Sequence, residues 1–582
     1  MAFWNYQTSA EAPPPLYPYV RTTERSRALF AGSAVAVVGL MCIPFGFFFA
    51  VFVPYLFLFF VLPLALLAII VIWALPDTDN APTGLLPPLI YLFITALFLW
   101  PNYLAISLPG LPWITMIRAT TFPLAFIFLI CASVSSGFRN DLAHALNAAP
   151  IVWKAMAAFA VIQVISIAFS KNTTQSFQTL LSATTSWTIV LFVSCYVFLK
   201  PGRVRRWAIL LWIMSLILGS IALIERNTHQ VLWGPHIPDF LRVGDEVVQR
   251  ILAGASRSTT GQYRTQSTFS TALGLSEYCA LTLPFVLHFM ATTRNIFVRT
   301  IAICTVPFLL FVIINTDARL GLLGFFLSLM VYLFLWGVLR WTRDKASLIG
   351  PAVVLVYPAI FCAAVASTFI VGRIKNKVWG TGQYAASNEG RMAQVRAGTP
   401  KVLDHPFGHG IGMGGDALGY TNKAGVQTVD SYLLQIGLDM GLFGLIAYSV
   451  LLIAPIFFAI KYSFKPAARD NENNFLVPLA GSLVNFTAIK FIFANDDNHP
   501  LMFMMVGIVI ALVCRVRDQS EPGWELAARR AARPYPSATS RTPSIPAAFK
   551  AAVSSSTARP SSSALRLRST RLEPKPSGPK KG

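Results

Sequence analysis

Long apolar runs constrain the fold of this chain more than any other feature. Runs of about 20 apolar residues, the length that crosses the hydrocarbon core of a bilayer, recur up to about residue 515. About fourteen are present, at 29–50, 54–75, 86–108, 112–134, 151–170, 178–199, 206–224, 271–291, 298–315, 320–340, 349–371, 432–460, 475–494 and 499–515. The pattern predicts an all-α polytopic membrane protein with about fourteen transmembrane helices.

Composition supports this prediction. The 582 residues are 55% hydrophobic and only 12% charged, and the mean hydropathy is +0.59. These values exclude a soluble enzyme. The seven cysteines all fall inside or at the edge of apolar runs, so the long external loops offer no disulfide and no thiolate metal site.

Basic residues in the short connections predict the orientation, because Lys and Arg are retained on the cytoplasmic side. They occur at Arg21 to Arg27, Arg139, 200–206, 292–299, 340–345 and 461–465. With fourteen spans and both termini inside, all of these connections are cytoplasmic. Two long loops, 225–270 and 372–430, then lie outside, and long loops can carry arginines there.

The two ends of the chain are interpreted as polar appendages to a transmembrane domain at 28–515. Residues 1–27 are predicted to be a cytoplasmic arm. Residues 516–582 are rich in Ser, Pro, Ala and Arg, and such a segment cannot bury a core. We expect a disordered basic cytoplasmic tail, held near anionic headgroups or bound to a specific partner. Nucleic acid is not an expected partner, because the basic residues lack interleaved aromatics.

A glycine-rich stretch, "HPFGHGIGMGGDALGY", occupies residues 405–420 of the second external loop. Gly410, Gly412 and Gly415 satisfy the spacing of a dinucleotide-binding turn. That turn requires a preceding strand and a following helix within a βαβ unit, whereas this stretch lies between two spans. We therefore reject a nucleotide cofactor. The glycines permit positive φ, so the stretch forms either an anion-binding concavity of amides or a tight turn packed on the membrane domain.

The order of motifs around this stretch resembles the O-antigen ligase and polymerase superfamily of bacterial membrane glycosyltransferases. The matching residues are Gly390 and Arg391, then Pro406, Gly408, Gly410 and Gly412, then Asp430 and Ser431, then Asp439, Gly441 and Gly444. The segments 263–285 and 315–326 also fit. The resemblance covers about 225–460. Ligases of this family usually have His-Asn or His-Ser where this chain has Asp430 and Ser431, which favours a polymerase.

The resemblance implies transfer of glycan from a polyprenyl-pyrophosphate donor to a hydroxyl of an acceptor glycan. It also implies a multi-pass protein of the bacterial inner membrane, with no cofactor and no metal. Expected partners are the lipid-linked donor, the acceptor, membrane lipids and other polysaccharide assembly proteins. Three alternatives stay open: a ligase that attaches glycan to lipid A core or protein, a polysaccharide transporter or flippase, and a non-catalytic scaffold.

The chemistry requires cations for the pyrophosphate, and guanidinium groups bind phosphate in a bidentate manner. The candidates are Arg264, Arg319, Arg391 and Arg396, with Arg257 and Arg373 behind them. Arg319 has the alternative of an interfacial pair with Asp317. Pro406, Gly408, Gly410 and Gly412 are expected to shape the loop.

For the general base the candidates are Asp430, His405 and His409, with Glu277 a fourth. Asp430 sits where a loop enters the membrane, and partial burial there raises the pKa of a carboxylate. The same residue, with Ser431, is also typical of a helix N-cap. Ser431, Gln435 and Asp439 recur every four residues and predict a polar stripe that lines a wet cavity. "NDDNHP" at 495–500 is interpreted as a helix cap.

Overall fold

The computed structural model describes residues 64, 67–77, 81–107, 113–256, 263–370, 372, 375, 385–421, 427–470 and 472–520. These residues include most of the two long loops predicted to be external. The predicted N-terminal arm, the apolar run at 29–50, most of the run at 54–75, Arg257, Arg373 and the tail beyond residue 520 lie outside the described residues.

Helices make up nearly all of the regular structure. The helices of the first half are α2 (Leu86–Leu99), α3 (Met116–Val134), α4 (Ser136–Leu146), α5 (Pro150–Ser166), α6 (Thr173–Ala183), α7 (Ile189–Val197), α8 (Arg203–Thr228) and α9 (Glu246–Leu252). Those of the second half are α10 (Ala272–Thr292), α11 (Ile296–Asn315), α12 (Arg319–Arg343), α13 (Ile349–Ile370), α15 (Ala385–Asp404), α16 (Gly414–Leu418), α17 (Tyr432–Ser463), α18 (Leu476–Lys490) and α19 (His499–Ser520). Two short antiparallel pairs join β1 (Ala105–Ile106) to β2 (Ile114–Thr115) and β3 (Ala255–Ser256) to β4 (Tyr263–Arg264).

The prediction of an all-α polytopic membrane protein is confirmed, but the count of fourteen spans is not. Within the described residues, ten helices are long and apolar enough to cross a membrane. Two predicted spans appear as shorter helices, α2 with 14 residues and α18 with 15, and both fall short of about 20. Helix α18 ends at Lys490, four residues before the end of its apolar run at 494, and the polar segment 495–500 begins only after that run.

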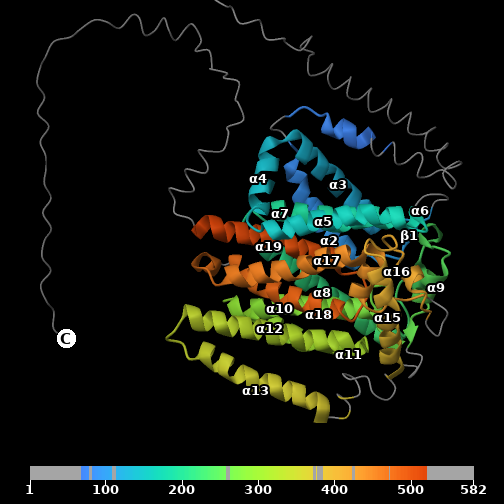
Figure 1. Ribbon diagram of the computed structural model, residues 1–582. Coiled ribbons are helices and arrows are strands. Elements are labelled where there is room, and N and C mark those ends of the chain that lie inside the picture. The colour runs from blue at the N-terminus through green and yellow to red at the C-terminus, as the bar shows by residue number, and fades with distance from the viewer. Residues whose placement is uncertain are drawn as a thin grey trace, which may run out of the picture. The chain divides into compact units, whose positions relative to one another are not determined.

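The long helices pack side by side. Neighbouring contacts run from α5 to α17, then α18, α10, α12 and α13, while α19 packs on α7 and α17. Figure 1 shows these helices stacked in nearly parallel layers, with the yellow helix α13 at the edge. The apolar stretches of α10 and α19 are almost entirely buried inside the protein, whereas the apolar stretch of α13 is not buried. This arrangement puts polar residues of α10 and α19 at the centre of the bundle, away from lipid.

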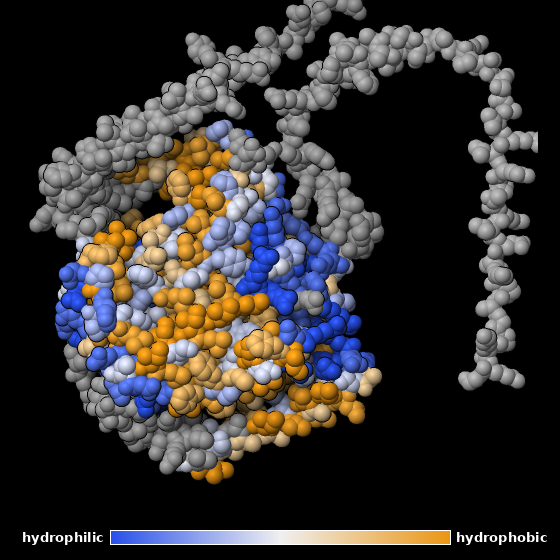
Figure 2. All heavy atoms as spheres, turned by 180° about the vertical axis from the view of Figure 1, so that it is seen from behind, coloured by the Kyte–Doolittle hydropathy of each residue, from blue (hydrophilic) through white to orange (hydrophobic). Residues whose placement is uncertain are grey.

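The connections gather in two separate groups at the ends of the helices. Three hydrogen bonds join the connections predicted to be external: Thr268 with Phe98, Ile411 with Ser166, and Ser431 with Phe491. At the other end Arg343 donates to Ser463 O and Arg517 to Asn147 O. Figure 2 shows a broad hydrophobic area across the middle of one face, with hydrophilic residues toward its sides.

A buried carboxylate stabilises each end of α8. At the N-terminus, Glu472 accepts hydrogen bonds from the amides of Gly202 and Val204, at 2.6 and 2.7 Å, and pairs with Arg515 at 2.8 Å. Near the C-terminus, Glu225 accepts from Tyr263 Oη at 2.7 Å and from backbone amides that include Ser267 N. The hydrogen bonds of Glu225 hold the turn that follows Arg264 against the bundle. Helix α19 also continues to Ser520, beyond the predicted start of the tail at 516.

Candidate functional site

Helix α17 is interrupted at Gly441. This residue has φ 68° and ψ −166°, which is not helical, and only glycine adopts such a conformation without strain. The interruption leaves the carbonyls of Leu438 and Asp439 without helical partners. The amides of His409 and Gly410 donate to them at 2.9 and 3.0 Å. The glycine-rich stretch therefore completes the backbone hydrogen bonding of a broken membrane helix.

The glycines of this stretch, defined here as the 405–414 loop, are required by its close approach to α17. Gly408, Gly410 and Gly412 have φ of 78°, 105° and 81°. A Cβ on Gly408 would lie 2.3 Å from Asp439 O, and a Cβ on Gly410 would lie 2.5 Å from that of Ser170. Pro406 lies at the same junction, because its carbonyl oxygen would be 2.0 Å from a Cβ on Gly441.

The amides of the loop bind an internal anion. Gly414 N donates to Asp439 Oδ1, and the amides of Gly412 and Met413 also hydrogen-bond this carboxylate. Successive amides directed at one point form an anion-binding concavity, and here the side chain of Asp439 fills it. Both interpretations left open by the sequence therefore apply, since the stretch is a turn packed on the membrane domain and a concavity for a carboxylate.

His405 and His409 lie together in this loop, with ring centroids 4.4 Å apart. His409 Nδ1 lies 3.1 Å from Leu438 O. Because a carbonyl only accepts, this contact places a proton on Nδ1 and leaves Nε2 as an acceptor in the neutral ring. Burial lowers the pKa of His409, and nearby His405 and lysines lower it further, against the contact with Leu438 O, which raises it.

Asp430 lies where the loop predicted to be external meets α17, beside Arg391 of α15. Arg391 Nε is 3.7 Å from Asp430 Oδ2, and Gln394 Oε1 accepts from Asp430 N at 2.8 Å. Burial raises the pKa of Asp430, and the Arg391 guanidinium lowers it in part. The N-cap of α17 is Ser431, whose Oγ accepts from Leu434 N. The carboxylate of Asp430 is therefore not used as the cap.

Arg264 and Arg319 both lie at the turn between α11 and α12, on the side predicted to be external. Arg264 Nε donates to Thr316 O at 3.0 Å, and Arg319 is the first residue of α12. Asp317 between them is buried and has φ 46°. The structure thus brings the side chain of Arg264 to the turn that precedes Arg319.

Arg396 is not brought to Arg391. The face of α15 that packs on α17 carries buried Gln394 and Gly398, whereas Arg396 is exposed. Five residues separate the two arginines on this helix, so they point about 140° apart around its axis. His409 is also separate from Asp430: it contacts Leu438, eight residues further along α17, or about 12 Å along a helix axis. Asp430 and the two histidines therefore lie in two different places and do not form one site.

Glu277 and Lys490 form a buried ion pair that the sequence did not reveal. Lys490 Nζ lies 2.9 Å from Glu277 Oε1, and the side chains are 0% and 1% exposed. Asn498 Nδ2 donates to Glu277 Oε2 at 2.9 Å and to Gly274 O at 3.0 Å. Glu277, a candidate base from sequence, is therefore committed to a structural network that joins α10, α18 and the segment before α19.

The "NDDNHP" segment contributes more than a helix cap. Asn495 and Asp497 hydrogen-bond each other, and Ser270 Oγ donates to Asp497 Oδ2 at 2.9 Å. Burial raises the pKa of Asp497 to about 6, with neighbouring Asp496 adding to the shift. Both aspartates line a cavity of about 190 Å³ that is also lined by Gln435 and Asp439 of the polar stripe.

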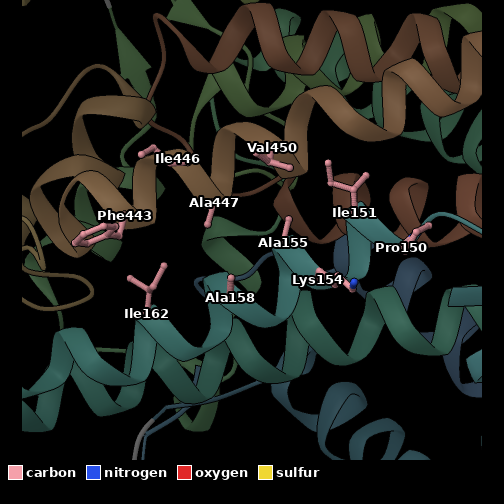
Figure 3. A pocket seen from close by; sticks show the side chains of 10 residues that line it. All are labelled: Pro150, Ile151, Lys154, Ala155, Ala158, Ile162, Phe443, Ile446, Ala447 and Val450. Atoms are coloured by element: carbon pink, nitrogen blue, oxygen red, sulfur yellow. The ribbon is translucent and has the colours of Figure 1, made fainter. Parts of the chain in front are cut away.

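An apolar groove of about 630 Å³ runs between α5 and α17 on the side of the helix interruption. Figure 3 shows Ile162 and Phe443 near one end and Pro150 with Lys154 near the other. Alanines at 155, 158 and 447 make room between the helices. Such a lining suits hydrocarbon chains of lipids, and it offers no group for acid–base chemistry apart from the terminal lysine.

One group of side chains in the described part of the chain could hold a metal ion. His144, Cys514 and Asp518 place ligand atoms within 4.8 Å of one another. His144 Nε2 lies 3.0 Å from Asp518 Oδ1, which makes the pair an ordinary ion pair when the ring is protonated. The group lies at the end of the bundle predicted to be cytoplasmic, away from Asp430 and the 405–414 loop.

Part of the chain matches a known family. Residues 304–449 match the family model described as O-Antigen ligase. The matched region runs from within α11, through the turn at Arg319, α15 and the 405–414 loop, to beyond the interruption of α17. No curated protein matches the chain. The match supports the resemblance to the O-antigen ligase/polymerase superfamily that the order of the motifs indicates.

Proposed function

We propose that this protein is a metal-independent, inverting glycosyltransferase that polymerises lipid-linked glycan at the outer surface of the bacterial inner membrane. The donor is a polyprenyl-pyrophosphate oligosaccharide and the acceptor is a glycan hydroxyl. The family match supports an O-antigen ligase or polymerase in general. The pairing of Arg391 with Asp430 at the mouth of α17 is the observation that carries the proposal.

The reaction is a single displacement. Asp430 takes the proton of the acceptor hydroxyl, and the oxygen attacks the anomeric carbon of the donor sugar. The bond from that carbon to the pyrophosphate oxygen breaks, and its electron pair leaves with the polyprenyl pyrophosphate. Attack opposite the leaving group inverts the anomeric configuration.

Each residue contributes a specific property. Burial raises the pKa of Asp430, which makes this carboxylate a better proton acceptor than an ordinary aspartate. Arg391 keeps its charge and stabilises the negative charge that develops on the leaving group, together with Arg264 and Arg319. Arg396 has no part in this scheme because its side chain is exposed on another face of α15.

A ligase would use the same displacement with a different acceptor. Asp430 in place of the usual histidine is the feature that favours polymerisation. A transporter would move the lipid-linked glycan without forming a glycosidic bond. These three activities differ in their products, so a single experiment can separate them.

The test is reconstitution in liposomes with lipid-linked repeat units and no nucleotide sugar. We expect the wild type to form chains of many repeats. Asp430→Asn and Arg391→Gln should each lose about 10²–10³-fold in rate, the usual cost of removing one group that stabilises developing charge. Arg250→Gln is the matched control, because Arg250 is exposed on α9 and its ion pair within the described part of the chain is with Glu246 of the same helix.

The outcomes discriminate between the candidates. Full activity of both folded variants would refute the assigned roles. Single transfer to a lipid A core acceptor, without elongation, would show a ligase. Movement of labelled glycan across the bilayer without a new glycosidic bond would show a transporter.

A further inference from the structure

Two polar cavities adjoin on one side of the first turns of α17. The inner cavity, of about 190 Å³, and the outer one, of about 550 Å³, share Asn102, Ile117, Ser182 and Ser186 in their linings. Their walls come from α3, α6, α17 and the segment before α19, with a π-helical turn at Thr184–Thr188 between α6 and α7. Such π turns are rare, and those that occur often lie at functional sites. The volumes suit a small ligand.

The inner cavity is lined by carboxylates and rigid rings. Asp439, Asp496 and Asp497 line it, together with Trp187 and Tyr432. Both rings pack on the imidazole of His499, with centroids 5.4 and 4.1 Å away. Fixed carboxylates accept hydrogen bonds in defined directions, and fixed rings offer flat apolar surfaces. Hydroxyl groups on one edge of a ligand and C–H groups on its face would match this lining.

The outer cavity is lined by neutral hydrogen-bond acceptors and by one cation, the side chain of Arg118. Arg118 donates to Trp113 O at 2.8 Å and to Ser182 Oγ at 3.1 Å, so the protein already occupies two of its donors. Asn102 Oδ1 is buried and, among the described residues, has no hydrogen-bond partner. A buried acceptor without a donor costs free energy, and a ligand hydroxyl at the shared wall would supply that donor.

The distribution of charged side chains indicates that the donor pyrophosphate and the acceptor glycan bind in different places. Pyrophosphate carries negative charge, and three carboxylates around the inner cavity would repel it at close range. The arginines assigned to the donor, Arg264, Arg319 and Arg391, do not line either cavity. Tyr432, which lines the inner cavity, lies only two residues after the proposed base Asp430 along the chain.

We propose that these cavities bind the acceptor glycan, with a neutral, hydroxyl-rich sugar in the inner cavity and its neighbour in the outer one. The inference rests on the proposed function and deepens it. Sugar hydroxyls donate to Asp439, Asp496 and Asn102, and the apolar face of the ring lies on Trp187. The attacking hydroxyl points toward Asp430, and the pyrophosphate stays on the arginine side.

The test separates the acceptor from the donor. A repeat-unit oligosaccharide on a neutral alkyl tag lacks the pyrophosphate leaving group, so it can only accept. Transfer to this probe from the polyprenyl-pyrophosphate donor gives a KM for each substrate. Ser182→Trp fills the wall shared by the cavities, and we expect the acceptor KM to rise at least tenfold while the donor KM changes less than twofold. Ser220→Trp is the matched control, because Ser220 is exposed on α8.

A second variant covers the case in which Ser182→Trp does not fold. Asp496→Asn removes a charge from the cavity with almost no change in volume, and its side chain is exposed enough to tolerate the change. We expect its acceptor KM to rise about threefold or more, with the donor KM unchanged. An unchanged acceptor KM in the folded variants, or a rise in the donor KM alone, would overturn the inference. Absence of transfer by the wild type would instead refute the proposed function.

Discussion

Substitution of Gly408 by alanine probes the junction between the 405–414 loop and the interrupted helix α17. The new Cβ would lie 2.3 Å from Asp439 O, so the loop would have to move away by about 1 Å to reach an ordinary contact. The hydrogen bonds from His409 N to Leu438 O and from Gly410 N to Asp439 O, at 2.9 and 3.0 Å, would not survive this movement.

The magnitude of the effect has two contributions. Alanine at φ 78° costs roughly 1–2 kcal/mol relative to glycine. Loss of two backbone hydrogen bonds costs roughly 1 kcal/mol each. The loop should therefore open more easily by about 3–4 kcal/mol, which corresponds to a factor of about 10²–10³ in the opening equilibrium. The remaining helices keep their packing, so the effect should be local.

Hydrogen exchange of peptides that cover the 405–414 loop, in detergent or nanodiscs, measures this opening directly. We expect much faster exchange at His409 and Gly410 in Gly408→Ala and unchanged exchange in α10 and α19. Gly415→Ala is the control, because nothing lies within 4 Å of its added Cβ and its φ is not positive. Equal protection of the loop in both variants would refute the account of the junction.

Three further predictions concern charged groups. Elongation should require the ionised form of Asp430. Because burial raises the pKa of Asp430, the rate should begin to fall, as the pH is lowered, at a higher pH than for an ordinary aspartate. Arg391→Gln removes the cation that lowers this pKa, so it should move the acid limb of the pH–rate profile to still higher pH. Glu277→Gln leaves the buried charge of Lys490 without its partner and should lower the free energy of unfolding by roughly 3–5 kcal/mol. The melting temperature should fall, and the double variant with Lys490→Met should partly restore it. Glu472→Gln should weaken the hold on the N-terminus of α8 by roughly 1–3 kcal/mol, and an unchanged thermal midpoint would contradict this.

The membrane fold could be predicted because apolar length and composition are local properties. Runs such as 206–224 and 432–460 reappear as α8 and α17, and ten helices in the described residues can span a bilayer. The exact count could not be predicted, since α18 ends at Lys490, where a buried ion pair with Glu277, 213 residues away in sequence, replaces lipid contact. Hydropathy does not record such a partner.

The candidate site could be predicted only in part. The glycine spacing indicated a loop with positive φ, and the four-residue repeat of Gln435 and Asp439 indicated a polar stripe on α17. Nothing in the sequence indicates that Asp439 fills the concavity made by the loop amides, because this contact depends on the interruption at Gly441. Arg118 was also missed, since it lies in an ordinary apolar run and its partner Ser182 lies 64 residues away.

The interruption of α17 has a consequence for chimeric proteins. Pro406 and Gly408 meet Asp439 and Gly441 at distances that leave no space for a methyl group, and their fit depends on both partners. A chimera that exchanges the 405–414 loop alone would join a foreign loop to a native helix and lose the matched backbone contacts. A chimera that keeps these contacts therefore has to exchange the 405–414 loop together with α17 as far as Gly441.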